Sequence, residues 1–165
     1  MQIYISNFYN TRFFTPETVI VDTSYWAPRW FDPANGKAPH LDKATGCIWG
    51  IKEESFLMSE DEIPKEMCSG KPCTYIDKFP ECEFLKAYWK HLQKIDFEGY
   101  LLPELNRIAE DVRKITHYEG EPKIVLMVHE KPENLCSERA GIVRLFKEHG
   151  IEVKEWTKEL VGEVF

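Results

Sequence analysis

Short apolar runs near both ends of the chain predict four β-strands. The clearest is Lys123–His129, because a continuous apolar run is typical of a strand covered on both faces. Thr18–Asp22 is a short β-branched run and predicts a second buried strand. Gln2–Ser6 and Ile151–Trp156 alternate apolar with polar residues, and the second of these suits a strand nearer the edge of a sheet.

Apolar residues at helical spacing predict three helices, over 83–94, 96–118 and 136–149. Pro103 interrupts the second pattern, so either its first turn is separate or the helix kinks there. Gly150 follows the third helix as a typical C-terminal stop. The side chains predicted to face inward are Phe84, Leu85, Tyr88, Leu92, Leu101, Leu105, Ile108, Val112, Ile115, Ile142, Val143 and Phe146.

Together these elements predict a three-layer α/β fold with a mostly parallel, Rossmann-like sheet flanked by helices, in a single domain over 1–165. The middle of the chain departs from this pattern. Residues 32–80 hold five of the ten prolines and four of the nine glycines, which predicts an irregular insertion after the second strand. Within it we expect one hairpin, Cys47–Ile51 against Ser55–Met58. The insertion is either a lid over a binding site or a cover for one sheet face.

Charge and hydropathy exclude several classes of function. The formal net charge is −7, which argues against a nucleic-acid binder and against docking on anionic lipid. No apolar run approaches the roughly 20 residues of a membrane span, and we see no signal peptide, so the predicted location is the cytoplasm. A homo-oligomer remains open.

The five cysteines are an odd count, which favours free thiols over disulfides. Cys68 and Cys73 are spaced as half of a zinc site that Cys47, His40 or Cys82 would complete. No second close pair of cysteines supports zinc, so the alternative is that these are ordinary thiols and that no cofactor binds.

Polar and aromatic side chains follow the carboxyl ends of the predicted strands, where ligands lie in open parallel sheets. A helix N-terminus, serine hydroxyls and the cations Lys131 and Arg139 suit an anionic group, and aromatic rings suit a planar one. Glu130 can accept hydrogen bonds from sugar hydroxyls. The predicted ligand-binding residues are Ser6, Phe8, Ser24, Trp26, Trp30, His129, Glu130, Lys131, Cys136, Ser137 and Arg139.

Each of these residues also has a purely structural interpretation. The aromatic rings can belong to the core, and Ser137 can simply stabilise the start of a helix. Arg139 can pair with Glu138, Glu130 or Glu133.

No catalytic set is assigned. Cys136 is a candidate nucleophile at a helix start, with His129 or Glu130 as candidate bases. However, the sequence lacks an arginine six residues after Cys136, as the Cys-x5-Arg phosphatase loop requires, and it lacks the glycine-rich loops of dinucleotide and ATP sites.

The segment Val128–Arg139, with a strand before it and an amphipathic helix after it, resembles the domain-of-unknown-function family numbered 488. Ile3–Phe8 is similar to the start of that family's phage-type branch, and Asp22–Trp30 resembles its second-strand loop. Gly46–Gly50 and Cys82–Leu85 look like the subgroup found in phage genomes. His129 and the Ser137-Glu138 pair depart from the family pattern. The resemblance spans Met1 to Trp156 and implies a small three-layer α/β fold but no settled activity.

Three functions remain open at this point. The first is a phage-type protein that binds a small, nucleotide-like anion in the host cytoplasm and sequesters a signalling nucleotide. The second is a hydrolase or transferase that acts on a nucleotide or nucleoside. The third is an acidic protein-interaction module that inhibits a host enzyme, which the negative charge and the 32–80 insertion would suit.

Overall fold

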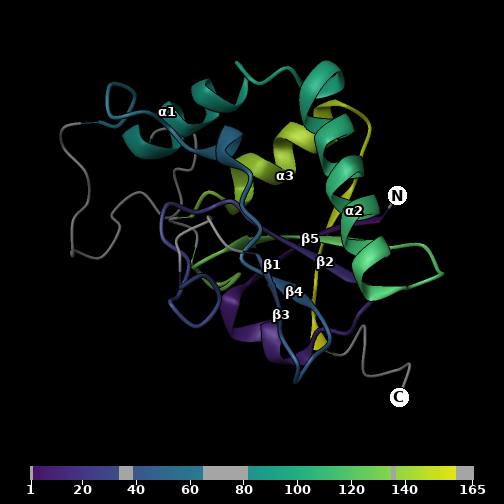
Figure 1. Ribbon diagram of the computed structural model, residues 1–165. Helices are drawn as coiled ribbons and strands as arrows, with labels where there is room; N and C mark the ends of the chain where they lie inside the picture. The colour runs from purple at the N-terminus through teal and green to yellow at the C-terminus, as the bar shows by residue number, and fades with distance from the viewer. Residues whose placement is uncertain (1, 34–38, 65–81, 135–136, 159–165) are drawn as a thin grey trace.

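The computed structural model describes residues 2–33, 39–64, 82–134 and 137–158. Its centre is a parallel sheet of four strands in the order β2-β5-β1-β6 (Figure 1). The strands are β1 (Gln2–Asn7), β2 (Thr18–Asp22), β5 (Lys123–Val128) and β6 (Val153–Glu155). The prediction of an α/β fold with a parallel sheet flanked by helices is confirmed.

The register of the sheet joins distant parts of the chain. Ile3 of β1 pairs with Ile124 of β5 on one side and with Val153 of β6 on the other. β1 therefore lies between β5 and β6, the two strands that come before and after the third predicted helix. In β5 every residue after Lys123 is buried, as its continuous apolar run predicts. β6 is shorter than predicted and lies at the edge of the sheet, as its alternating pattern predicts.

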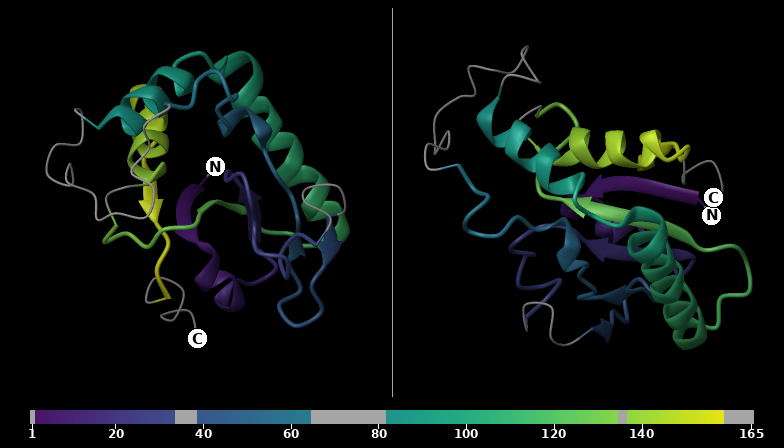
Figure 2. Two further views of the ribbon diagram at one scale, coloured as in Figure 1. Left: turned by 90° about the vertical axis from the view of Figure 1, so that its left-hand side faces the viewer. Right: turned by 90° about the horizontal axis from the view of Figure 1, so that it is seen from above.

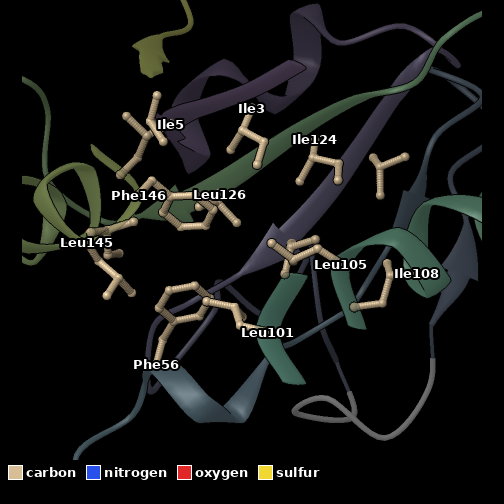
Figure 3. Packing of buried hydrophobic residues seen from close by; sticks show 14 of the residues in the cluster. Ile3, Ile5, Phe56, Leu101, Leu105, Ile108, Ile124, Leu126, Leu145 and Phe146 are labelled. Atoms are coloured by element: carbon tan, nitrogen blue, oxygen red, sulfur yellow. The ribbon is translucent and has the colours of Figure 1, made fainter. Parts of the chain in front are cut away.

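Three α-helices cover one face of the sheet: α1 (Glu83–Leu92), α2 (Leu102–Thr116) and α3 (Arg139–Glu148) (Figures 1 and 2). Their apolar stripes pack on alternate side chains of the strands and form the larger core (Figure 3). Leu101, Leu105 and Phe146 are fully buried there. Adjacent α1 and α3 approach closely at Gly141, because a Cβ atom at that position would lie 3.2 Å from side-chain atoms of Tyr88 and Leu92.

The opposite face of the sheet carries no α-helix in the part of the chain that the structure describes. The 3₁₀-helix η1 (Phe8–Phe13) covers part of this face. The two-stranded ribbon of β3 (His40–Leu41) and β4 (Ile48–Trp49) lies beside β2, with Ile48 in the larger core and Trp49 packed on the opposite side. A second core lies here, built from the remaining alternate strand residues and the aromatic residues Phe8, Phe14, Phe31 and Trp156.

Three sequence predictions need correction or refinement. The predicted hairpin is wrong: β4 pairs antiparallel with β3, and residues 54–56 form a short 3₁₀-helix, η2 (Glu54–Phe56). Ile115 is 58% exposed and lies outside the core, where it lines a surface hollow beside Pro39 and Ile48. Before Pro103 the chain forms the π-helical turn η4 (Phe97–Leu101), which differs in winding from α2 but continues into it directly. The Asp96 carboxylate caps this turn by accepting from Gly99 N (3.0 Å).

The described part of the 32–80 segment packs on the body of the protein. Cys47, Phe56 and Met58 are buried in the two cores, and Lys52 forms a parallel bridge to Asp22 along the outer edge of β2. No helix within the described ranges has the length and apolar character needed to cross a membrane.

Candidate functional site

The serine hydroxyls predicted to meet a ligand are buried and hydrogen-bonded within the protein. The Ser6 hydroxyl accepts from Asn10 Nδ2 (2.8 Å), and the Ser24 hydroxyl donates to Asp22 Oδ1 (2.6 Å). Ser137 Oγ accepts from the backbone N–H of Arg139 (3.1 Å) at the start of α3. This is the structural role that the sequence analysis gave as the alternative to ligand binding. These hydroxyls hold loops at the strand ends.

The Arg139 side chain is likewise hydrogen-bonded within the protein. Its Nε and Nη2 donate to the two carboxylate oxygens of Glu155 at 2.9 and 3.0 Å, and its Nη1 donates to the Glu130 carbonyl at 2.6 Å. The arginine therefore ties the start of α3 to β6 and to the loop after β5. Its partner is Glu155, which the sequence analysis did not consider. Ser137 and Arg139 line a groove of about 480 Å³ along α3, together with Val143 and Lys147.

The aromatic residues gather at a different place. Phe8, Tyr9, Thr11 and Arg12 of η1, with Trp30 and Trp49, line a hollow of about 310 Å³ that we call the aromatic hollow. The rings of Trp30 and Trp49 meet edge to face with centroids 5.2 Å apart. Tyr9 is 59% exposed and Trp30 is 49% exposed. The indole Nε1 of Trp49 is buried and has no hydrogen-bond partner among the described residues.

Basic side chains lie against the rings beside this hollow. The Arg12 guanidinium lies 4.0 Å from the centre of the Tyr9 ring, and Lys131 Nζ lies 5.4 Å from the centre of the same ring. Arg12 and Lys158 also lie 4.8 Å from the Phe13 ring. Although the net charge of the protein is −7, these basic side chains lie together next to exposed aromatic rings at the carboxyl end of β1.

Trp26 and His129 lie near each other but do not line the aromatic hollow. Trp26 is 71% exposed, and its backbone carbonyl contacts His129 Nε2. The His129 ring lies 5.1 Å from the ring of Phe8, which does line the hollow. The residues of the single site predicted from the sequence are thus divided between the groove along α3, the aromatic hollow, and the loops after β2 and β5 that carry Trp26 and His129.

A buried carboxylate marks the carboxyl end of β2. Asp22 is 1% exposed, and its Oδ1 accepts from both the backbone N–H (2.8 Å) and the hydroxyl (2.6 Å) of Ser24. Its Oδ2 lies 4.0 Å from Lys52 Nζ and has no hydrogen-bond partner in the described part of the chain. Burial raises the pKa of Asp22 above its usual value, against the opposing effect of the Ser24 hydrogen bonds and the Lys52 charge.

Glu138, directly before α3, faces the same region. Burial, together with the charge of the neighbouring Glu130 carboxylate and a hydrogen bond to it, raises the pKa of Glu138 to about 7. The Asp22 charge acts in the same direction. Burial raises the pKa of Tyr88 on α1, and the charge of Glu138 adds to that rise. The Tyr88 hydroxyl is buried and has no hydrogen-bond partner among the described residues. We call Asp22, Glu130, Glu138 and Tyr88 the carboxyl cluster.

The cysteine predictions are tested only in part. Cys136, Cys68 and Cys73 lie outside the described residues. Cys47 and Cys82 are buried free thiols, and burial raises the pKa of Cys47 to about 11. Cys47 Sγ donates to the Thr15 carbonyl (3.1 Å). Among the described side chains, no group of three histidine, cysteine or acidic residues is arranged to hold a metal.

Two groups of functional candidates were missed by the sequence analysis. Arg12 follows Phe8 and Tyr9 by one 3₁₀ turn, and recognising it requires knowing that residues 8–13 are helical. Trp49 joins the hollow only because β4 pairs with β3. Glu138 was considered only as a partner of Arg139, and its electrostatic effect on Tyr88 depends on the packing of α3 against α1.

In comparisons with known proteins, the chain matches no family model, no curated protein and no solved structure.

Proposed function

We propose that this protein binds a small nucleotide-like ligand, with its planar group in the aromatic hollow and its anionic group beside Arg12 and Lys131. The observation that carries the proposal is the meeting of Tyr9, Trp30 and Trp49 with these cations at the end of β1. The proposal takes the fold as Rossmann-like, in which ligands lie beyond the carboxyl ends of parallel strands, and the four-stranded parallel sheet is compatible with that.

The geometry of the hollow suits a planar ring with polar edges. The exposed rings of Tyr9 and Trp30 offer stacking surface, which contributes about 1–3 kcal/mol per base in single-strand binders. A guanidinium such as that of Arg12 can grip a phosphate through two N–H groups.

The test is calorimetry and tryptophan fluorescence with nucleoside monophosphates, cyclic nucleotides, the matching nucleosides and inorganic phosphate. Tyr9→Ala and Trp30→Ala should each weaken binding by about 5- to 150-fold, the equivalent of the lost stacking. Arg12→Gln should weaken binding of the phosphorylated ligands and leave the nucleosides unchanged. Trp26→Ala is the matched control, because it removes an exposed indole that lies outside the hollow.

The proposal fails if no member of the panel binds, or if Trp30→Ala and Trp26→Ala affect binding equally. The same samples are analysed for products by chromatography. Product that disappears in Glu138→Gln would support the hydrolase or transferase in place of simple binding and sequestration.

A further inference from the structure

Three basic side chains and two aromatic rings form a continuous series of contacts that begins in the aromatic hollow and leads out of it. Lys131 Nζ lies 5.4 Å from the centre of the Tyr9 ring, and the Arg12 guanidinium lies 4.0 Å from the same centre. The Arg12 guanidinium and Lys158 Nζ each lie 4.8 Å from the centre of the Phe13 ring. Tyr9 and Arg12 line the hollow, whereas Phe13 and Lys158 lie beyond it. We call Arg12, Lys131 and Lys158 the cationic row.

The cationic row has no counter-charge in the part of the chain that the structure describes, where none of its members forms an ion pair. Exposed arginines elsewhere do form such pairs. Arg107 pairs with Glu104 and Asp111, and Arg144 lies 3.5 Å from Glu148. The chain has 28 acidic residues against 21 basic ones, so carboxylates are plentiful. The positive charge of the row is therefore available to a ligand.

The arrangement of the row favours a ligand with several negative charges. Like charges held close together repel one another, and contact with exposed rings offsets this repulsion only in part. The rings also restrict the basic side chains before a ligand arrives, which reduces the conformational entropy lost on binding. A guanidinium and two ammonium groups offer more N–H donors than one phosphate group can accept.

We propose that the cationic row binds an oligophosphate chain, so that the ligand is a nucleoside di- or triphosphate. The inference rests on the proposed function for the position of the base in the aromatic hollow. Arg12 would hold the phosphate nearest the base, because it lines the hollow, and Lys158 would hold a phosphate further along the chain. The sequence lacks glycine-rich phosphate loops, so side chains would bind these phosphates in place of backbone N–H groups.

Calorimetry on the full chain tests this with adenosine and guanosine mono-, di- and triphosphates and with inorganic tripolyphosphate. The buffer contains no magnesium and has constant ionic strength, because a divalent cation would neutralise the phosphates. Each added phosphate should tighten binding by about 3- to 10-fold. Lys158→Gln should remove most of the gain between monophosphate and triphosphate and leave the affinity for the monophosphate unchanged.

The matched control is Lys154→Gln, which removes the same charge from an exposed lysine of β6 that forms no cation–π contact among the described residues. It should preserve the gain from the added phosphates. An equal loss of that gain in Lys154→Gln and Lys158→Gln would overturn the proposal, because the gain would then reflect the overall charge of the protein.

The remaining outcomes separate this inference from the proposed function. Equal affinity for monophosphate and triphosphate would overturn the oligophosphate site and leave nucleotide binding in the aromatic hollow intact. If tripolyphosphate binds through Lys158 as tightly as the nucleoside triphosphates do, the cationic row is supported and the placement of a base in the hollow is refuted. If none of these compounds binds, both proposals are overturned.

Discussion

Removing the Glu155 carboxylate should destabilise the fold strongly, because it leaves the Arg139 guanidinium inside the protein without its counter-charge. The Arg139 side chain is 11% exposed and that of Glu155 is 28% exposed. Two charge-assisted hydrogen bonds at 2.9 and 3.0 Å are lost, and only the bond to the Glu130 carbonyl remains. A fully buried pair loses about 3–5 kcal/mol when one partner is removed, and partial exposure places Glu155→Ala at about 2–3 kcal/mol.

The same reasoning predicts that replacing both partners costs little. Burial raises the pKa of Glu155 despite the hydrogen bonds from Arg139, which shows that desolvation offsets much of what the pair gains. The double variant Arg139→Met/Glu155→Leu should therefore lie within about 1 kcal/mol of the wild-type stability.

Urea unfolding followed by circular dichroism measures these differences in the free energy of unfolding. The matched control is Glu148→Ala, which breaks the exposed pair with Arg144 (3.5 Å) and should cost less than about 0.5 kcal/mol. If Glu155→Ala is as mild as Glu148→Ala, the reasoning is refuted. Arg139 would then find adequate solvation without Glu155, and it would again be a candidate for binding an anionic ligand.

Three further predictions concern stability. Ser59 hydrogen bonds lower the pKa of Glu62 to about 2, so its carboxylate should contribute about 1 kcal/mol above the unfolded-state pKa near 4.5. Urea unfolding should show this contribution fading as pH falls from 4.5 towards 2, and Glu62→Gln should remove that part of the pH dependence. Leu105→Ala empties a fully buried position and should cost about 2–5 kcal/mol, whereas Ile115→Ala on the same helix should cost under about 0.5 kcal/mol. Gly150 has φ +78°, so Gly150→Ala should cost about 1 kcal/mol in the same assay, and an unchanged midpoint would contradict this.

The elements that the sequence predicts well are those whose pattern is local. The apolar run of β5 and the apolar stripes of α1 and α3 can be recognised without knowing their neighbours. A strand buried on both faces is apolar throughout, and a helix buried on one side has apolar residues at helical spacing. The two-residue strands β3 and β4 leave no such pattern, and the predicted hairpin was therefore wrong.

The candidate sites were predicted only in part, because they depend on which strands become neighbours. The position of β6 beside β1 brings Glu155 to Arg139, and nothing near either residue in the sequence indicates that pairing. Phe8 and Trp30 were predicted and do line one hollow. Their basic neighbour Arg12 was not predicted, because its place follows from the 3₁₀ winding of residues 8–13.

The order of the sheet also bears on how this protein is made. β1 is synthesised first among the strands, yet both of its neighbours belong to the last third of the chain, with Ile3 beside Ile124 and Val153. During translation β1 therefore stays unpaired until β5 and β6 have left the ribosome. Contacts of such wide sequence separation slow folding. We therefore expect the nascent chain to depend on chaperones, and truncation before β6 to yield insoluble protein.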